Sequence, residues 1–168
     1  MLHRDKPQGD GFQRVYRQHA DAVYRVCYGF MKNSADAEDA VQEAFLKFLR
    51  TDQSFESESH ERAWLIVTAS NICKNLLKSW TRQKREDVEN TEELLPACND
   101  REEISPVLEA VLSLPEKYKT VIYLYYYEEY SCREIASFMG KKESSIRSLL
   151  KRGRAVLEKK LGGDTDEK

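Results

Sequence analysis

Apolar residues recur at the spacing of an α-helix along most of this chain, and no stretch alternates apolar and polar residues for long. They mark one helical face over residues 12–32, and the same pattern returns over 35–49 and over 61–84. Seven glycines and four prolines among 168 residues interrupt it rarely. The periodicity therefore predicts an all-α protein.

The helical pattern is lost in two places. Residues 50–61 are polar and rich in serine, and we expect them to form a loop. Residues 85–105 hold eight acidic and two basic side chains, a net charge of −6, and little apolar area to bury. We interpret 85–104 as a flexible acidic linker between two small helical domains, 1–84 and 105–163.

The second domain carries the signals of a helix-turn-helix. Ser105 and Pro106 open it as a cap and a first helical residue, and the expected helices are 106–112, 115–129, 132–139 and 143–161. Ser131 and Glu134 form a capping box at the third helix. Gly140 supplies the left-handed turn that ends this helix before the fourth begins.

The fourth helix is amphipathic and strongly basic. Its expected buried face holds Ile146, Leu150, Gly153, Leu157 and Leu161. The remaining faces carry short hydroxyls near the start and cations further along, a pattern that suits a helix in the major groove of DNA. The candidate DNA-binding residues are Ser144, Ser145, Arg147, Ser148, Lys151, Arg152 and Arg154. A solvated basic face on a helical hairpin is the alternative.

The helix over 61–84 is also basic, because residues 62–85 contain six bases and no acid. A solvated helix usually mixes signs, so this bias favours a polyanionic partner. The candidate nucleic-acid contacts are Trp64, Asn71, Lys74, Lys78 and Arg82, on the side that also carries Val67. Taken alone, Trp64 is better explained as a partly buried packing residue.

The helix over 35–49 begins with acidic residues, which the helix dipole alone explains. Glu38, Gln42 and Phe45 share one side, however, and together form an acidic, partly apolar surface for a protein partner. The residues themselves favour the dipole explanation.

Neither a cofactor nor a metal is expected. The four cysteines lack CxxC spacing and the three histidines are scattered, so we expect reduced thiols in a cytoplasmic protein. The start of the sequence lacks the apolar segment of a signal peptide, and no apolar run is long enough to span a bilayer.

Three stretches together resemble the extracytoplasmic-function sigma factors, the smallest group of the sigma-70 family. They are YRQHADAVYRVCYGFMKNSADAEDAVQEAFLKFL, RAWLIVTASNICKNLLKSW and LPEKYKTVIYLYYYEEYSCREIASFMGKKESSIRSLLKRGRAVL, and they occur in the family's order. The resemblance covers most of residues 12–161. It implies a subunit that binds core RNA polymerase, directs it to promoter DNA and helps to melt that DNA.

The resemblance also assigns roles to the candidate residues. It implies that Asp36, Glu38, Asp39, Gln42 and Glu43 face polymerase, which overrides the dipole explanation. The loop over 53–60 and the basic helix after it would hold the −10 element, with Asn71 at the asparagine of the family's motif. The last helix would enter the major groove at the −35 element. An anti-sigma factor, common in the family, is a further expected partner that the sequence does not identify.

Some positions depart from the family's pattern. Thr68 replaces a usual isoleucine, Lys142 a common proline, and Leu149 a common arginine. Leu149 cannot make the phosphate contact of that arginine, and Arg147, Lys151 and Arg152 are expected to compensate for it.

Other classes of protein remain as alternatives. A helix-turn-helix regulator that acts without docking on polymerase would explain the second domain and leave the first idle. The sequence has no catalytic constellation, so an enzyme is not expected. A redox or metal sensor would use Cys98 or Cys132.

Overall fold

The computed structural model describes residues 10–86 and 105–162, which form seven helices and no strand. The prediction of an all-α protein is confirmed. The chain separates into two compact units, divided between Asn99 and Asp100. We call residues 10–86 the N-terminal unit and residues 105–162 the C-terminal unit, and each is described by itself.

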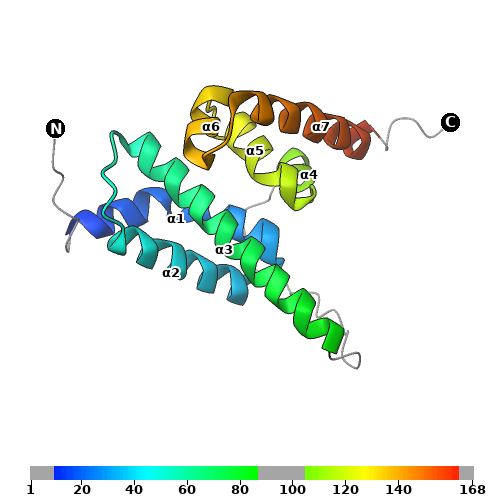
Figure 1. The fold of residues 1–168 in the computed structure, drawn as a ribbon. Coiled ribbons are helices and arrows are strands. Elements are labelled where there is room, and N and C mark those ends of the chain that lie inside the picture. The colour runs from blue at the N-terminus through cyan, green and yellow to red at the C-terminus, as the bar shows by residue number, and fades with distance from the viewer. Residues whose placement is uncertain (1–9, 87–104, 163–168) are drawn as a thin grey trace. The chain divides into compact units, whose positions relative to one another are not determined.

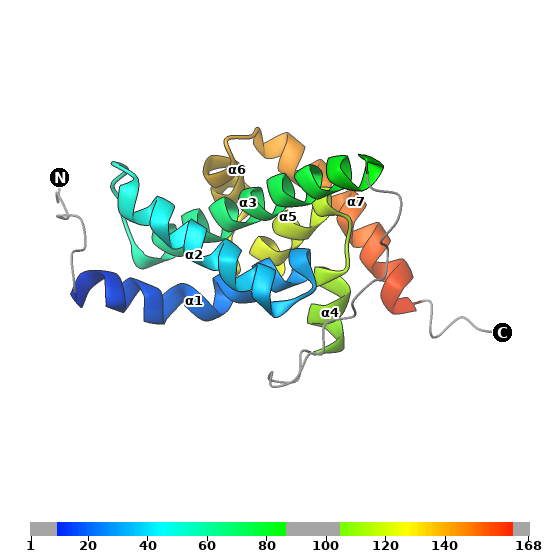
Figure 2. The same ribbon diagram turned by 90° about the horizontal axis from the view of Figure 1, so that it is seen from below.

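The N-terminal unit consists of three long helices that all pack on one another: α1 (Asp10–Met31), α2 (Ser34–Arg50) and α3 (Glu58–Glu86). The chain reverses between α1 and α2, which lie side by side with α3 across them (Figures 1 and 2). The core includes Val15, Val23, Val26, Val41, Ala44, Phe48, Leu65, Ile66, Ala69 and Ile72. Each fully buried aliphatic side chain contributes about 1.5–3 kcal/mol to such a core.

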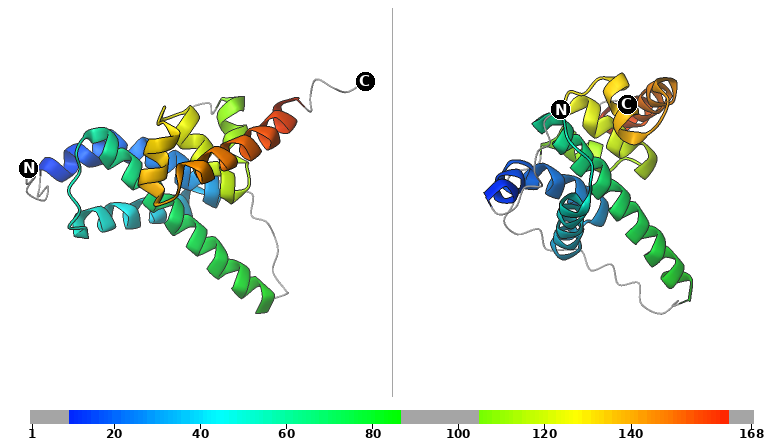
Figure 3. Two further views of the ribbon diagram at one scale, coloured as in Figure 1. Left: turned by 45° about the horizontal axis from the view of Figure 1, so that its top comes forward. Right: turned by 60° about the vertical axis from the view of Figure 1, so that its left-hand side comes forward.

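The start of α2 is fixed by a side-chain cap. Asn33 has extended backbone angles, and its side-chain oxygen accepts from the Asp36 amide at 2.9 Å, which satisfies one of the first helical donors. At the other end of the unit, the last turns of α3 extend beyond α1 and α2 (Figure 3). Part of the basic face of α3 is thereby carried away from the bundle.

The C-terminal unit consists of four shorter helices: α4 (Pro106–Leu112), α5 (Glu116–Tyr126), α6 (Cys132–Met139) and α7 (Glu143–Gly162). Its core comprises Leu108, Val111, Leu112, Leu114, Val121, Ile122, Tyr123, Leu124, Ile135, Ile146 and Leu150. Both α5 and α7 contact all the other helices of this unit, so the basic helix α7 is part of the packed fold rather than an appendage.

The predicted turn signals are present. Ser105 Oγ accepts from the Leu108 amide at 3.1 Å, and Ser131 Oγ accepts from the Glu134 amide at the same distance. The Glu134 carboxylate accepts from the Ser131 hydroxyl at 3.1 Å, so the capping box closes through the side chains. Gly140 adopts φ 63° and ψ 34°, the left-handed conformation that allows α6 to end and the chain to turn into α7.

Several helix limits differ from the predicted ones. Helix α3 begins at Glu58 and continues through Glu86, two residues into the segment interpreted as linker; the rest of that segment, 87–104, lies outside the described residues. Helix α5 ends at Tyr126, three residues before its predicted end. Glu129 takes φ 58°, a left-handed conformation that a helix through this position would not allow.

Candidate nucleic-acid and protein interfaces

The outer face of α2 is acidic and accessible. Glu38, Asp39, Gln42 and Glu43 are exposed. Asp36 is only half-buried, and its carboxylate accepts from the Asn33 side-chain amide at 2.6 Å as part of the helix cap. Four of the five acidic or amide side chains predicted to face a partner are therefore available on one surface, and the fifth also has a local role.

The apolar part of this surface differs from the prediction. Phe45 was expected to form an accessible surface with Glu38 and Gln42, and this prediction was wrong. Phe45 is 2% exposed, because its ring packs against Tyr16 at 4.8 Å and Phe12 at 6.1 Å. Leu46 is 48% exposed. It lies one turn after Gln42 and Glu43, so it is the apolar side chain that the acidic face presents.

The basic side of α3 is largely accessible. Asn71, Lys78 and Arg82 are exposed and Lys74 is half-buried. Val67, placed on this side from the sequence, is buried instead, so the accessible surface begins about one turn later. Val67 thus separates Trp64 from the polar residues further along the helix.

Trp64 belongs to a cluster of four aromatic rings. Its ring lies edge-on to Phe48 at 5.9 Å and to Phe55 at 5.7 Å, while Phe55 also stacks on Phe48 at 5.1 Å and meets His60 at 5.2 Å. Such edge-to-face and offset contacts each contribute about 0.5–1.5 kcal/mol beyond burial. Phe55 therefore fastens residues 51–57, which the sequence suggested only as an irregular polar loop.

Backbone contacts reinforce this loop at the start of α3. The Glu61 amide donates to the Ser57 carbonyl at 3.1 Å, and the His60 amide donates to Ser57 Oγ at the same distance. The Glu56 amide donates to His60 Nδ1 at 3.3 Å. Ser57 is thus the serine that caps α3, which explains why the helix starts before its predicted position.

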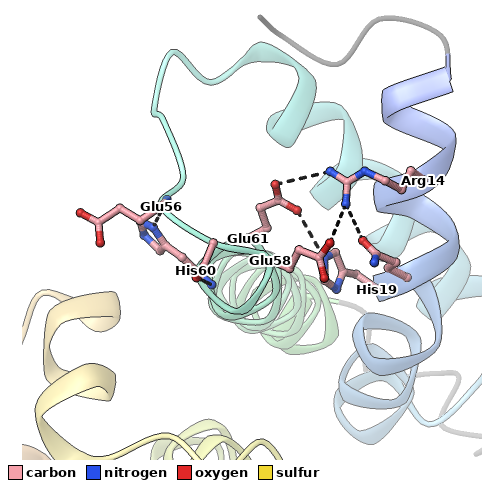
Figure 4. Close-up of polar contacts among 8 residues, drawn as sticks. Arg14, His19, Glu56, Glu58, His60 and Glu61 are labelled. Atoms are coloured by element: carbon pink, nitrogen blue, oxygen red, sulfur yellow. Dashed lines mark hydrogen bonds and ion pairs between the residues drawn. The ribbon is translucent and has the colours of Figure 1, made fainter. Parts of the chain in front are cut away.

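A polar network joins the same turn of α3 to α1 (Figure 4). His19 Nε2 lies 3.5 Å from Glu61 Oε2, and both side chains are almost fully buried. Arg14 reaches Glu61 at 3.8 Å and Glu58 at 3.3 Å. Burial lowers the pKa of His19 from its ordinary value of 6.5, and the contact with Glu61 opposes this change. The network ties the loop-bearing end of α3 to α1.

Helix α7 presents all of its candidate residues to the outside. The exposed set comprises Ser144, Ser145, Arg147, Ser148, Lys151, Arg152 and Arg154. Ile146, Leu150 and Gly153 are buried on the opposite side, as predicted, whereas Leu157 is only half-buried and Leu161 is 41% exposed. The predicted buried face is thus confirmed for its first three turns.

Two arginines of α7 have specific partners. Arg147 donates to the Glu143 carboxylate at 2.6 Å, one turn earlier on the same helix. The Arg154 guanidinium lies over the rings of Tyr125 and Tyr126, at 5.4 and 5.7 Å from their centroids. The second contact could not be predicted from the periodicity of one helix, because Arg154 and the tyrosines are almost 30 residues apart.

The three cysteines among the described residues do not suggest a site, and Cys132 is half-buried. Cys27 and Cys73 are buried free thiols, and the hydrogen bond that the Cys27 thiol donates to Cys73, together with burial, raises the pKa of Cys27 far above its usual range. Cys98 lies outside the described residues. Over residues 10–86 and 105–162, no group of three or more potential ligands is arranged to hold a metal ion. No helix in these two ranges is long and apolar enough to cross a membrane.

Comparison with known proteins adds evidence for both units. Residues 15–85 match the family described as Sigma-70 region 2, and residues 104–157 match that described as Sigma-70, region 4. The chain is similar to the ECF RNA polymerase sigma factor SigW of Bacillus subtilis, with 30% identity over 93% of this chain and 91% of that protein. It is also similar to SigE of Mycolicibacterium smegmatis, with 29% identity over 97% of this chain, which spans 66% of that longer protein.

One solved structure shares the fold. The sigma factor RpoE of Bartonella quintana, crystallised with the anti-sigma factor NepR, superposes with a TM-score of 0.69 at 21% identity. The match covers 94% of this chain and 98% of that one.

Proposed function

The chain belongs to the extracytoplasmic-function sigma factors of the sigma-70 family, and we propose that it binds core RNA polymerase and directs promoter recognition and melting. The observation that carries this proposal is the presence of both sigma regions in order, over residues 15–85 and 104–157. A helix-turn-helix regulator that acts without polymerase is not favoured, because it would leave the match over the N-terminal unit unexplained.

The acidic face of α2 is the proposed polymerase-docking surface. Asp36, Glu38, Asp39, Gln42 and Glu43 are its polar members, and the exposure of the last four supports the assignment. A mainly acidic, rigid helix steers association with a basic partner surface and fixes its register. We add Leu46 as its apolar contact, because an exposed leucine inside a charged face is a suitable anchor.

The loop over 51–57 and the basic side of α3 are proposed to hold the −10 element. Lys74, Lys78 and Arg82 follow the phosphates, and Asn71 bonds a base edge. Trp64 contributes by packing on Phe55, which sets the shape of the loop. Opening follows because a base taken out of the stack gains contacts that offset an unstacking cost of a few kcal/mol.

The recognition helix α7 is proposed to enter the major groove at the −35 element. Ser144, Ser145 and Ser148 allow close approach of the backbone, while Arg147, Lys151, Arg152 and Arg154 supply base and phosphate contacts. Each helix alone binds DNA weakly and with strong salt dependence. Attachment of both units to polymerase makes the second contact intramolecular, which raises its effective concentration.

This mechanism uses binding energy alone and no catalytic step by the chain itself. The acidic segment 85–104 is proposed as the tether that follows the path of nucleic acid through polymerase, and an anti-sigma factor as the inhibitory partner.

Reconstituted transcription tests the proposal. Core polymerase with the purified chain is expected to produce transcripts from a defined set of promoters, and sequencing those transcripts identifies the −35 and −10 elements. Arg147→Ala should change the preference among −35 sequences, whereas Lys159→Ala, further along the same helix, should weaken binding evenly. The absence of chain-dependent transcripts would refute the proposed function, and an identical uniform loss in both variants would refute base reading by Arg147.

Asn71 is tested separately by the reactivity of unpaired thymines with permanganate. Asn71→Ala is expected to reduce reactivity in the −10 region while the complex with core polymerase still forms. Normal opening by this variant would remove Asn71 from the melting step.

A further inference from the structure

Arg154 differs from the other exposed cations of α7 because two aromatic rings support it. The guanidinium carbon lies 5.4 Å from the Tyr125 centroid and 5.7 Å from that of Tyr126, and the two rings meet edge to face at 5.0 Å. Tyr126 is 46% exposed, so this contact lies at the surface of the unit. A cation over a ring face at such a site gains about 0.5–1 kcal/mol.

These ring contacts leave the hydrogen-bonding groups of the side chain uncommitted. Among the described residues, Arg154 contacts the two rings and makes no hydrogen bond or ion pair, so its five N–H donors are not engaged by another acceptor. A phosphate binds arginine through two of these donors. The tyrosines therefore restrict the rotation of the side chain without using the donors that an anion needs.

Arg147 is held in a different way. Its guanidinium already donates to the Glu143 carboxylate at 2.6 Å, so one of its five donors is engaged and a negative charge lies beside it. Arg147 is on the second turn of α7, and Arg154 lies seven residues later, about 10 Å further along the axis. The first turns of a recognition helix meet base edges, while later turns approach the sugar-phosphate backbone.

We propose that Tyr125 and Tyr126 position Arg154 as a preformed anchor for a backbone phosphate at the edge of the −35 site. Arg154 then supplies sequence-independent affinity, and base discrimination belongs to residues nearer the start of α7. This assignment rests on the proposed function of α7, and it makes the two tyrosines positioning residues on a different helix from the one that binds DNA.

The salt dependence of binding by the complete holoenzyme tests the role of Arg154. Removal of one phosphate contact lowers the slope of log affinity against log salt concentration by about 0.9. Arg154→Ala should show this decrease and an affinity loss of roughly fivefold. The ranking of promoters that differ in the −35 element should not change. A changed ranking would make Arg154 a base reader, and an unchanged slope would remove it from the interface; either result overturns the proposal.

A double-mutant cycle tests the tyrosine support. Tyr126→Leu should weaken binding in the wild-type background and have no further effect in Arg154→Ala, because its only route to DNA is through that arginine. Tyr126→Phe retains the ring and should bind like wild type. Additive losses in the double variant, or a Phe variant as weak as the Leu variant, would contradict the positioning role.

Two controls complete the design. Val107→Ala removes a side chain of similar exposure, 49%, from α4 and should leave the slope unchanged. Far-ultraviolet circular dichroism and thermal unfolding establish that each variant is folded. If wild-type holoenzyme shows no dependence on the −35 sequence, the proposed function of α7 fails together with the anchor. If wild-type holoenzyme depends on the −35 sequence but Arg154→Ala leaves both affinity and salt slope unchanged, only the proposed role of Arg154 fails.

Discussion

The two units place a basic helix at the surface by different means. In the N-terminal unit, α3 is fixed at its start, where Phe55 enters the ring cluster and His19 meets Glu61, while its later turns extend beyond the bundle. In the C-terminal unit, α7 is fixed along its middle, where Gly153 lies against Ile122 of α5. Helix α3 is thus buried as far as Cys73 and then leaves the bundle, whereas α7 packs on every other helix of its unit.

This difference predicts which properties can be separated by mutation. A change at the start of α3 alters the loop over 51–57 without touching the exposed cations further along the helix. A change at the middle of α7 moves the whole recognition surface relative to α5. The two tryptophans, Trp64 and Trp80, both belong to α3, so tryptophan fluorescence reports on the N-terminal unit alone.

The largest expected effect comes from the docking surface, because both units depend on it. The double variant Asp39→Ala with Glu43→Ala should reduce affinity for core polymerase at least about tenfold and abolish transcription from every promoter. Both side chains are exposed, so thermal unfolding should not change. Asp21→Ala removes another exposed acid of the same unit, from α1, and serves as the control. If Asp21→Ala lost as much affinity for core polymerase as the double variant, the loss would reflect the overall charge of the unit rather than the docking surface.

The next largest effect is expected at Phe55. Phe55→Ala removes ring contacts with Phe48, His60 and Trp64, so the loop loses its anchor. We expect strand opening, measured with permanganate, to decrease about tenfold while polymerase binding persists, and the N-terminal unit to lose about 1–2 kcal/mol of stability. Ser54→Ala, in the same loop, is the control. If Phe55→Ala lowers the midpoint of thermal unfolding, followed by tryptophan fluorescence, but leaves promoter opening unchanged, the shape of the loop does not matter for DNA melting.

Gly153 provides the corresponding test in the C-terminal unit. A Cβ at this position would lie 2.9 Å from both Cγ1 and Cδ1 of buried Ile122 and 3.2 Å from Tyr118 Cβ. Gly153→Ala should therefore destabilise this unit by about 1–2 kcal/mol, although alanine normally favours a helix. Hydrogen exchange of α5 and α7 should accelerate, and the tryptophan signal should not respond. Gly162→Ala meets nothing within 4 Å and is the matched control. Increased protection in Gly153→Ala would contradict the packing account.

The smallest expected effect is the pH dependence caused by His19. The pKa of His19 is lower in the folded unit than in the unfolded chain, so protonation of His19 favours unfolding. The stability that neutral His19 contributes is therefore fully present above pH 6.5 and is lost as the pH falls below that value. Glu58, Glu61 and Arg62 also act on this side chain. We compare the midpoints of thermal unfolding, followed by tryptophan fluorescence, at about pH 7.5 and about pH 5.5. His19→Gln should reduce the difference between these two midpoints. An identical difference in both proteins would exclude His19 as its source.

Local signals were predicted well from the sequence. The caps at Ser105 and Ser131 and the turn at Gly140 all occur as expected, because each depends on residues only a few positions apart. The early end of α5 was not predicted. Glu129 adopts a left-handed conformation there, and the sequence has no glycine at that position to signal it.

Tertiary packing decided the remaining differences. Phe45 and Leu46 are neighbours of similar hydrophobicity, and only the presence of Tyr16 and Phe12 on α1 determines that the first is buried and the second exposed. Phe55 offered no periodic signal, because an anchor in a loop belongs to no helical face. Arg154 was identified as a cation of α7, but the tyrosines that contact it belong to α5. The residue pattern of α7 alone could not predict that contact.

Complex formation with core polymerase tests the central claim most directly. Size-exclusion chromatography of the purified chain with its cognate core enzyme should show co-elution, and the mixture should open promoter DNA that neither component opens alone. A chain that elutes separately from core polymerase would contradict the account, even if its last helix bound duplex DNA with high affinity.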